Sequence, residues 1–148
     1  MNDPDQIREA LVTAESVAVV GCSPRPDRAS HAIARYLVAQ GYRVIPVNPG
    51  HREILGLACY PSLREIPGKR PIDIVDVFRR SEAVAPIAED AIARGARFFF
   101  MQLGVTDPES ARRLEAAGIG VAMDRCILVE HGRLGVPPRE ARNFTGPV

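Results

Sequence analysis

Arginine, serine and cysteine side chains gather in one short stretch, residues 21–30, which reads GCSPRPDRAS. The apolar run of residues 17–20 precedes it, and a helical pattern begins at Ala29. A buried strand, a polar loop and a helix N-terminus in this order form the place where α/β proteins bind phosphorylated ligands. The stretch therefore predicts a site for an anionic ligand, with the candidate residues Gly21, Cys22, Ser23, Arg25, Arg28 and Ser30.

Arginine also follows four of the five strands that the sequence predicts: Arg25 and Arg28, Arg52, Arg79 and Arg80, and Arg125. Because the carboxyl ends of parallel strands meet at one edge of a sheet, these guanidinium groups are expected to gather where they suit phosphate oxygens. The alternative is that they pair with Asp27, Asp76 and Asp124. Chance placement is a further alternative, since Lys69 is the only lysine and every other basic residue is arginine.

Regular elements that would position these side chains can be read from the apolar pattern. Helices are expected over residues 5–14, 30–40, 81–94, 108–118 and 126–134, and strands over residues 17–21, 42–47, 72–78, 97–103 and 119–123. Their alternation predicts the α/β class, with a Rossmann-like doubly wound parallel sheet of about five strands flanked by helices. Residues 57–60 are expected to add a short strand.

The ends of several helices carry recognisable signals. Asp3, Ser81 and Asp107 are expected N-caps, and Ser62 and Glu65 have the spacing of a capping box. Pro86 falls after the first turn of the helix over residues 81–94, so that helix is either kinked or begins later.

A length of 148 residues predicts one domain. The N-terminal helix, residues 1–15, is expected to belong to the same domain as residues 16–136, and residues 137–148 are expected to form a flexible tail. Three scattered cysteines, Cys22, Cys59 and Cys126, favour reduced thiols and hence the cytoplasm. The polar start is unlike a signal peptide, and no apolar run approaches the ~20 residues of a membrane span.

Composition also narrows the class of partner and of chemistry. A net charge of +1 gives no reason to expect nucleic acid or a membrane surface as partner. No cysteine or histidine pair has ligand spacing, so no metal site is expected. No set of serine, histidine and acid can be assembled, so no catalytic residue is proposed, and we lean against an enzyme. His31 would either contact ligand or lie at the surface, and His131 is expected to be a solvated surface residue.

A nicotinamide dinucleotide is the obvious ligand for such a loop, but the sequence opposes it. The fingerprint needs three glycines, and residues 21–26 supply only Gly21. The acidic residue expected after the second strand, which would bind the ribose hydroxyls, is replaced by Asn48 and Pro49. A reductase that uses NAD or NADP therefore remains only an alternative.

The chain resembles the small bacterial coenzyme A-binding protein family, which is similar to the coenzyme A-binding domain of the succinyl-coenzyme A synthetase α subunit. The resemblance covers about residues 17–134 and rests on VAVVGCSPRPDRASHAIARYLVAQGYRVIPVNPG, YPSLREIP, DIVDVFRRSE, FMQLGV and MDRCILVEHGRL. It implies that coenzyme A (CoA), or an acyl form of it, is bound at the carboxyl ends of the strands. Phe100 is one departure, since relatives commonly carry tryptophan there.

The resemblance also implies a set of contacts. The first loop would contribute Gly21, Cys22, Ser23 and Arg25. The end of the second strand would contribute Asn48, Pro49 and His51. One wall of the site would be formed by Val77, Phe78 and Arg79, and another wall by Gln102, Leu103 and Gly104. The synthetases act through a phosphorylated histidine in a further domain, so a ligase-like subunit that needs a partner chain is a second alternative. The protein partner, if any, is unknown, and a regulatory module stabilised by its ligand is a third alternative.

Two cysteines invite a separate hypothesis. Cys22 and Cys126 follow predicted strands at the ligand edge, where arginines and a helix N-terminus would lower a thiol pKa. Either could then form a mixed disulfide with the CoA thiol. The alternative interpretation is that both are small packing residues.

Overall fold

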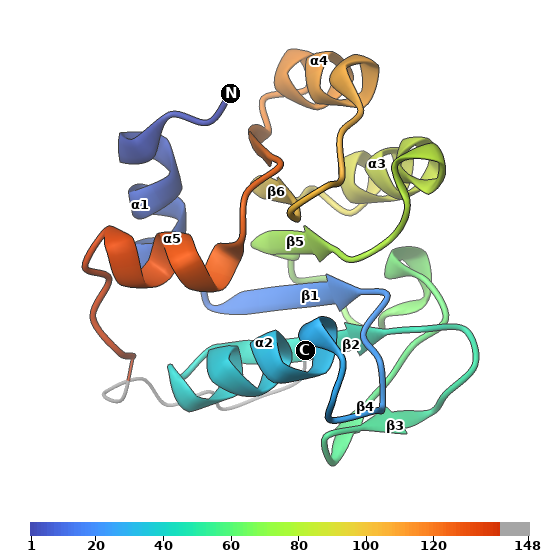
Figure 1. The fold of residues 1–148 in the computed structure, drawn as a ribbon. Coiled ribbons are helices and arrows are strands. Elements are labelled where there is room, and N and C mark those ends of the chain that lie inside the picture. The colour runs from blue at the N-terminus through green and yellow to red at the C-terminus, as the bar shows by residue number, and fades with distance from the viewer. Residues whose placement is uncertain (140–148) are drawn as a thin grey trace.

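A central sheet of five parallel strands organises the computed structural model, which describes residues 1–139 (Figure 1). The strand order is β2-β1-β5-β6-β7, and every neighbouring pair is parallel. The strands are β1 (Ser16–Val20), β2 (Arg43–Val47), β5 (Ile74–Val77), β6 (Phe98–Met101) and β7 (Gly120–Met123). The predicted α/β class and the Rossmann-like doubly wound sheet are therefore confirmed.

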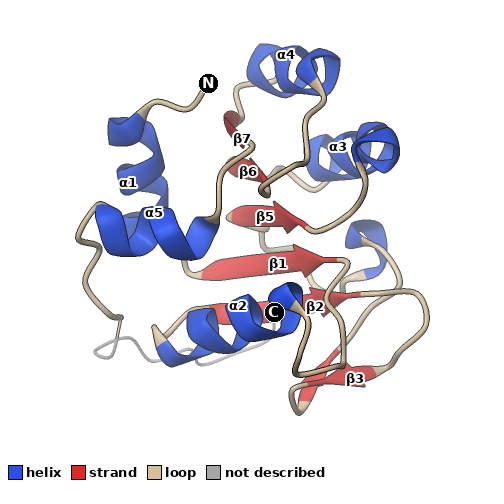
Figure 2. Ribbon diagram, in the orientation of Figure 1, coloured by secondary structure: helices blue, strands red, loops and turns tan. Residues whose placement is uncertain are grey.

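Helices cover both faces of this sheet (Figure 2). One face packs against α1 (Pro4–Thr13), α2 (Ala29–Ala39) and α5 (Ile127–Arg133). The other face packs against α3 (Val84–Ala93), α4 (Pro108–Ala116) and the short 3-10 helix η1 (Leu63–Glu65). Because both faces are covered, strand residues are buried whichever way they point, which explains the continuous apolar runs in the sequence.

Phenylalanines of β6 show how the two apolar layers are built. Phe99 packs in the layer under α3 and α4, whereas Phe98 and Phe100 pack in the layer under α1, α2 and α5. Their rings lie 5.2 Å apart between centroids. Burial of one such side chain contributes about 1.5–3 kcal/mol, so this strand is a large part of the core.

Helix α3 begins later than the sequence pattern suggested. A 3-10 turn, η2 (Ser81–Ala83), precedes it, and α3 starts at Val84. Pro86 then lies in the first turn, where no intrahelical bond needs its missing N–H, so of the two alternatives the later start is confirmed. Ser81 does not cap the helix: its Oγ accepts a hydrogen bond of 2.9 Å from the backbone N–H of Thr106.

Two other expected caps also find different partners. Asp107 occupies the N-cap position of α4 but makes no side-chain cap bond, and instead accepts a hydrogen bond from the Ser110 hydroxyl. Ser62 donates its hydroxyl to the Glu65 carboxylate at 3.0 Å and makes no cap bond to a backbone N–H, although the helical turn that the spacing indicates is present as η1. Asp3 does cap α1, since its Oδ1 accepts the Asp5 N–H at 2.9 Å.

A small antiparallel hairpin follows β2. Its strands are β3 (Glu53–Ile54) and β4 (Leu57–Ala58), joined through Leu55 and Gly56, which both have positive φ. The expected strand over residues 57–60 is thus shorter than predicted, and β3 was not predicted. Tyr60 instead forms an isolated parallel bridge with Val47.

The beginning of the chain is fastened to the edge of the sheet. Asn2 donates its backbone N–H to Val121 at 2.9 Å and its side-chain amide to the Met123 carbonyl at 3.1 Å, and it accepts the Met123 N–H at 2.7 Å. None of the helices within residues 1–139 is long and apolar enough to cross a membrane.

The segment predicted to be a tail, residues 137–148, is described only as far as Arg139. That residue is buried, donates its backbone N–H to the Gln40 carbonyl at 2.8 Å, and places its guanidinium 5.4 Å from the centre of the Tyr42 ring. The rest of the predicted tail lies outside the described residues.

Candidate functional site

A cleft of about 460 Å³ opens at the carboxyl ends of the strands. The chain leaves β1 for β2 on one side, and the later strands β5, β6 and β7 lie on the other side. Such a reversal of strand order leaves a crevice between the loops that leave in opposite directions. The cleft is lined by Gly21, Ser23, Arg28, Ala29, Ser30, Asn48, Phe78, Arg79, Gln102, Leu103 and Val105. Nine of the sixteen residues predicted for the site are in this set.

The first loop is held in shape by its own serines. Ser30, which is buried in the first turn of α2, accepts the Ser23 N–H at 2.9 Å, and the Ser23 hydroxyl accepts the Arg25 N–H at 3.1 Å. Nδ1 of His31 lies 2.9 Å from the Ser23 carbonyl oxygen. His31 is thus buried and does not line the cleft. Its contact with Ser23 helps to hold the loop in place.

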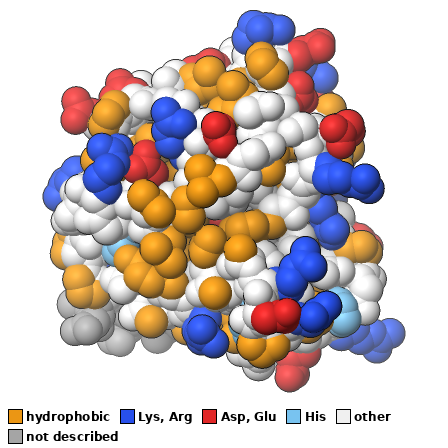
Figure 3. All heavy atoms as spheres, viewed as in Figure 1, with side chains coloured by type: hydrophobic (Ala, Val, Ile, Leu, Met, Phe, Trp, Pro, Cys, Tyr) orange, Lys and Arg blue, Asp and Glu red, His pale blue; other side chains and the backbone are white. Residues whose placement is uncertain are grey.

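Positive charge and free backbone donors meet at the cleft. Helix α2 begins at Ala29, and Arg28 at its N-cap position makes no side-chain cap bond. The first amides of α2 therefore keep their capacity to bind an anion, and the helix dipole favours negative charge there. Figure 3 shows Lys and Arg side chains gathered on the right of the view, the side to which the strand arrows of Figure 1 point.

Two arginines line the cleft, and their charges are not neutralised locally. Within residues 1–139, no carboxylate forms an ion pair with Arg28 or Arg79. The side chain of Arg79 runs beside Gly21, since its Nε lies 3.2 Å from where a Cβ of residue 21 would be. This pair of guanidinium groups is suited to hold an oxyanion.

Seven predicted residues do not line the cleft: Cys22, Arg25, Pro49, His51, Val77, Gly104 and Cys126. Arg25 is exposed and pairs with Asp27 at 3.1 Å. His51 is exposed, and Val77 is buried within β5. Pro49 lines a smaller pocket of about 180 Å³, which shares Arg79 with the cleft. Gly104 donates its N–H to the Asp124 carboxylate at 2.7 Å, and Cys126 lies at the N-cap position of α5.

The three aspartates that the sequence offered as arginine partners have different contacts in the structure. Asp27 does pair with Arg25, whereas Asp124 accepts a backbone N–H instead. Asp76 pairs with no arginine: it is completely buried, and its Oδ1 accepts a hydrogen bond from Nε2 of Gln102. Burial raises the pKa of the Asp76 carboxyl to about 8. Sequence reasoning missed this residue as part of the site, although its acidic side chain within an otherwise apolar strand was a signal.

Of the two interpretations of the thiols, packing is the one that fits Cys22. Cys22 is fully buried, and burial, followed by the nearby Cys59 and Asp76, raises the pKa of its thiol to about 11. The expected lowering of the pKa is therefore wrong for Cys22, which behaves as a packing residue. Burial also raises the pKa of Cys59. Cys126 is partly exposed.

His131 is buried as well, contrary to the prediction of a solvated residue. Its ring is 2% exposed, shares a hydrogen bond of 2.8 Å with the Tyr36 hydroxyl, and lies edge-on to Tyr36 and Tyr42. Burial lowers the pKa of this imidazole. The residue belongs to the packing between α2 and α5 and not to the cleft.

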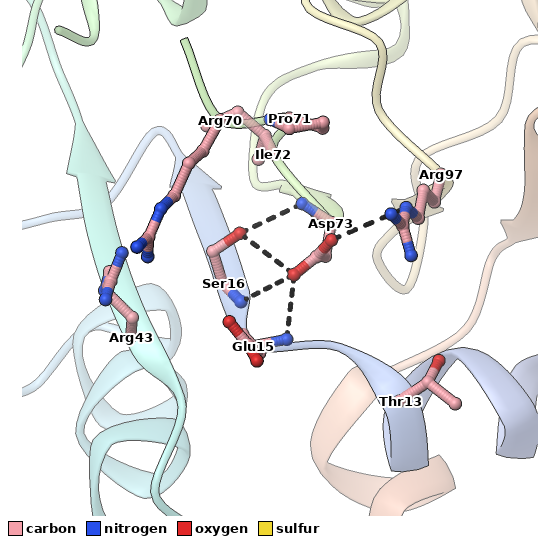
Figure 4. Close-up of a pocket in the computed structure, with 9 residues that line it drawn as sticks. All are labelled: Thr13, Glu15, Ser16, Arg43, Arg70, Pro71, Ile72, Asp73 and Arg97. Atoms are coloured by element: carbon pink, nitrogen blue, oxygen red, sulfur yellow. Dashed lines mark hydrogen bonds and ion pairs between the residues drawn. The ribbon is translucent and has the colours of Figure 1, made fainter. Parts of the chain in front are cut away.

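A second hollow, of about 240 Å³, lies at the opposite edge of the sheet, where the strands begin (Figure 4). Asp73 is at its centre: Oδ2 accepts the N–H groups of Glu15 at 2.8 Å and Ser16 at 3.1 Å, and Oδ1 faces Arg97 at 3.7 Å. Asp73 and Ser16 thus tie the start of β1 to the loop before β5. The cleft at the carboxyl ends is the better candidate, because the N-terminus of α2 and two arginines line it and, within residues 1–139, no carboxylate at its centre is paired with them. The described residues hold no group of three or more metal-ligating side chains.

Comparison with known proteins identifies similar chains. Uncharacterized protein YneT of Bacillus subtilis is 44% identical over 126 residues, which is 85% of this chain and 92% of YneT. A hypothetical protein from Pyrococcus horikoshii has a similar structure, with a TM-score of 0.84, 37% identity, and coverage of 89% of this chain and 92% of that one. The ADP-forming acetate–CoA ligase I of Archaeoglobus fulgidus is 39% identical over 69 residues, 47% of this chain but only 10% of the ligase.

The family itself is also identified. Residues 15–132 match the family described as the CoA binding domain, and this match spans all five strands of the sheet. The resemblance predicted from the sequence motifs is therefore confirmed, and the chain belongs to the CoA-binding domain family.

Proposed function

We propose that this protein binds CoA, or an acyl form of it, in the cleft at the carboxyl ends of the strands. The observation that carries the proposal is the convergence of Arg28, Arg79 and the N-terminus of α2 on one cleft, in a chain of the CoA-binding domain family. CoA carries a 3′-phosphate and a pyrophosphate. Both need cationic side chains or backbone N–H donors, which this cleft offers.

Different residues of the cleft lining would bind different parts of the ligand. Arg28, Arg79 and the first amides of α2 would bind phosphate oxygens. Phe78 and the 67% exposed Leu103 would cover apolar parts of the ligand. Asn48 would act indirectly, since its side chain already donates to the Cys22 carbonyl at 2.9 Å and accepts the Gly50 N–H at 3.0 Å.

We propose binding without a chemical step by this chain. The nucleophiles near the cleft are engaged elsewhere: Cys22 is buried with a raised thiol pKa, and Ser23 and Ser30 bond to loop amides. A cytoplasmic location is part of the proposal, because the three cysteines are free thiols.

A ligase-like subunit is the second candidate, favoured by the similarity to the acetate–CoA ligases. That function needs a partner chain to supply the remaining part of the ligase, because this chain matches 10–20% of the ligases' length. Co-purification with a protein that carries the missing ligase domains would favour it over simple binding. A nicotinamide-dependent reductase is the least supported candidate, since Ser23 and Pro26 replace glycines of the fingerprint.

Thermal unfolding with a panel of ligands tests the proposal. CoA and acetyl-CoA are expected to raise the unfolding temperature, and dephospho-CoA is expected to do so less because it lacks the 3′-phosphate. NAD, NADP and ATP at the same concentration serve as controls. Stabilisation by NADP and none by CoA would overturn the proposal in favour of the reductase.

A further inference from the structure

One carboxyl group lies beneath the floor of the cleft without a full set of partners. Asp76 is 0% exposed and lies in β5, next to Val19 of β1 and Phe100 of β6. Its Oδ1 accepts a hydrogen bond from Gln102, whereas its Oδ2 is buried and has no partner. Burial of an incompletely bonded carboxyl costs stability, so an apolar residue would serve this strand better if packing were its only task.

Gln102 connects this carboxyl to the cleft. It is 4% exposed and lines the cleft, and its backbone is fixed because its N–H donates to Val77 at 3.3 Å and its carbonyl accepts the Val105 N–H at 2.8 Å. Its Nε2 points inward to Asp76. The side-chain oxygen Oε1 has no partner among the described residues and is not one of their fully buried unbonded atoms, so it keeps some exposure in a residue that lines the cleft.

An ionised Asp76 fixes the orientation of the Gln102 amide, and a neutral Asp76 keeps this orientation when its proton is on Oδ2, the oxygen that has no partner. An ionised carboxylate offers only acceptors, and a neutral carboxyl with its proton on Oδ2 still offers Oδ1 as an acceptor. Burial raises the pKa of Asp76 to about 8, so the neutral form dominates near pH 7. Cys22 and Cys59 are the titratable groups nearby, and their thiol pKa values are raised as well. The interior behind Gln102 is therefore largely uncharged near pH 7, and in the structure Oδ1 of Asp76 accepts the Gln102 amide N–H.

We propose that Asp76 is a positioning residue that fixes the Gln102 amide with its oxygen toward the cleft, where it accepts a hydrogen bond from an uncharged N–H, O–H or S–H group of the ligand. This inference rests on the proposed function, because the donors of that kind in CoA are the adenine amino group, the amides, the hydroxyls and the thiol. Arg28 and Arg79 are suited to the phosphates, and Gln102 is suited to the neutral part of the same molecule.

The orientation is tested without ligand by NMR of the Gln102 side-chain amide. In the wild type, its two N–H protons should show contacts to β5, and their shifts should move with the Asp76 titration. In Asp76→Val, which keeps a strand-forming side chain of similar size, the contacts should be lost. Absence of contacts between these N–H protons and β5 in the wild type would overturn the proposal.

CoA affinity, measured by titration calorimetry on the same proteins, tests the consequence. Gln102→Leu should weaken binding about three- to tenfold, the value of one neutral hydrogen bond. Asp76→Val should weaken binding by the same factor or less, and Asp76→Asn should retain it because the asparagine oxygen still accepts the amide. Ile74→Val, two residues earlier on the same face of β5, is the matched control and should leave affinity unchanged.

The double variant Asp76→Val/Gln102→Leu separates positioning from general structural damage. If Asp76 acts through Gln102, the double variant binds as Gln102→Leu does. If the two losses add, Asp76 acts by another route and the proposal is wrong. A folded wild type that binds no CoA would overturn the proposed function, and the amide signals would still decide whether Asp76 holds Gln102. Should Asp76→Val fail to fold, the other two variants still test the proposal, because Asp76→Asn should retain the CoA affinity and Gln102→Leu should lower it.

Discussion

The carbonyl oxygen of Phe78 occupies the space that a side chain at position 21 would need: a Cβ on Gly21 would lie 2.3 Å from it. Gly21 also has a φ of +84°, which other residues rarely adopt. Gly21→Ala should therefore lower the free energy of unfolding by roughly 3 kcal/mol or more, from backbone strain and from displacement of the loop after β5. Because Arg79 lies in that loop, CoA affinity should fall too. Chemical denaturation and calorimetry measure the two effects.

Gly118→Ala is the matched control for this substitution. Gly118 has the same φ of +84°, but a Cβ there would meet nothing within 4 Å. Only the backbone strain remains, about 1–2 kcal/mol, and CoA affinity should be unchanged. Equal losses of stability in the two variants would contradict a special role for the contact between Gly21 and Phe78.

Arginine substitutions test the phosphate side of the cleft. Arg79→Ala and Arg28→Ala should each weaken CoA binding about tenfold or more, the cost of a lost charge-assisted hydrogen bond. The loss should shrink as salt is added, because screening weakens the charge contacts of the wild type. Arg112→Ala, on the exposed side of α4, is the control and should bind normally.

Arg25→Ala gives a finer comparison on the same loop. Its guanidinium is engaged by Asp27 and lies outside the cleft lining, so we expect a smaller loss than for Arg28→Ala. A larger loss for Arg25→Ala would mean that the loop rearranges around the ligand.

Asp76 makes stability depend on pH. Its carboxyl pKa is raised from the ordinary 3.8 to about 8, so between these pH values the folded state holds a proton that the unfolded state has released. Raising the pH from 4 to 8 should therefore reduce stability, by up to about 1.4 kcal/mol per pH unit, with no further loss from this group above its folded pKa. Asp76→Asn should flatten this slope in urea denaturation at a series of pH values. An unchanged slope would show that Asp76 is ionised in the folded protein.

His131 should make the stability of the protein depend on pH in the acidic range. Burial lowers its pKa from 6.5, so below about pH 6.5 the unfolded state binds a proton that the folded state resists. Stability should therefore fall as the pH drops through this range, again by at most about 1.4 kcal/mol per pH unit. The difference between the curves of the wild type and His131→Asn isolates this term from that of Asp76. A difference in stability, wild type minus variant, that stays constant as the pH falls below about 6.5 would contradict the assignment.

Alkylation of the folded protein should distinguish the three thiols. Cys126 is partly exposed and should react first with iodoacetamide at pH 7.5, whereas Cys22 and Cys59 are buried with raised thiol pKa values and should react only after unfolding. Peptide mass spectrometry after brief treatment gives the order. The same assay with oxidised CoA decides the mixed-disulfide hypothesis for Cys126, and modification of Cys22 in the folded state would contradict its burial.

Local sequence patterns predicted the sheet well, because residues buried on both faces must be apolar. The same burial misled the interpretation of Asp76, whose alternation with isoleucine and valine resembles the polar face of a strand. Its true environment depends on α1, α2 and α5 covering that face, which no local pattern contains. Ser81 shows the same limit of local patterns, since its hydroxyl accepts a hydrogen bond from the backbone N–H of Thr106, a residue far along the chain.

The sequence predicted which loop forms the site, but it could not predict which side chains of that loop line the cleft. Arg25 and Arg28 are three residues apart in one turn, and only the folded loop shows that Arg28 lines the cleft while Arg25 faces Asp27. His131 could not be recognised as buried, because the tyrosines that enclose it come from α2 and from the start of β2.

The contacts of Asn2 with Val121 and Met123 bear on how the protein behaves at high concentration. Strand β7 is an outer strand of the sheet, and an outer strand offers unpaired N–H and carbonyl groups to other molecules. Asn2 occupies several of these groups with bonds of 2.7–3.1 Å. Asn2 therefore leaves fewer backbone N–H and carbonyl groups of this outer strand free to pair with the sheet of another molecule.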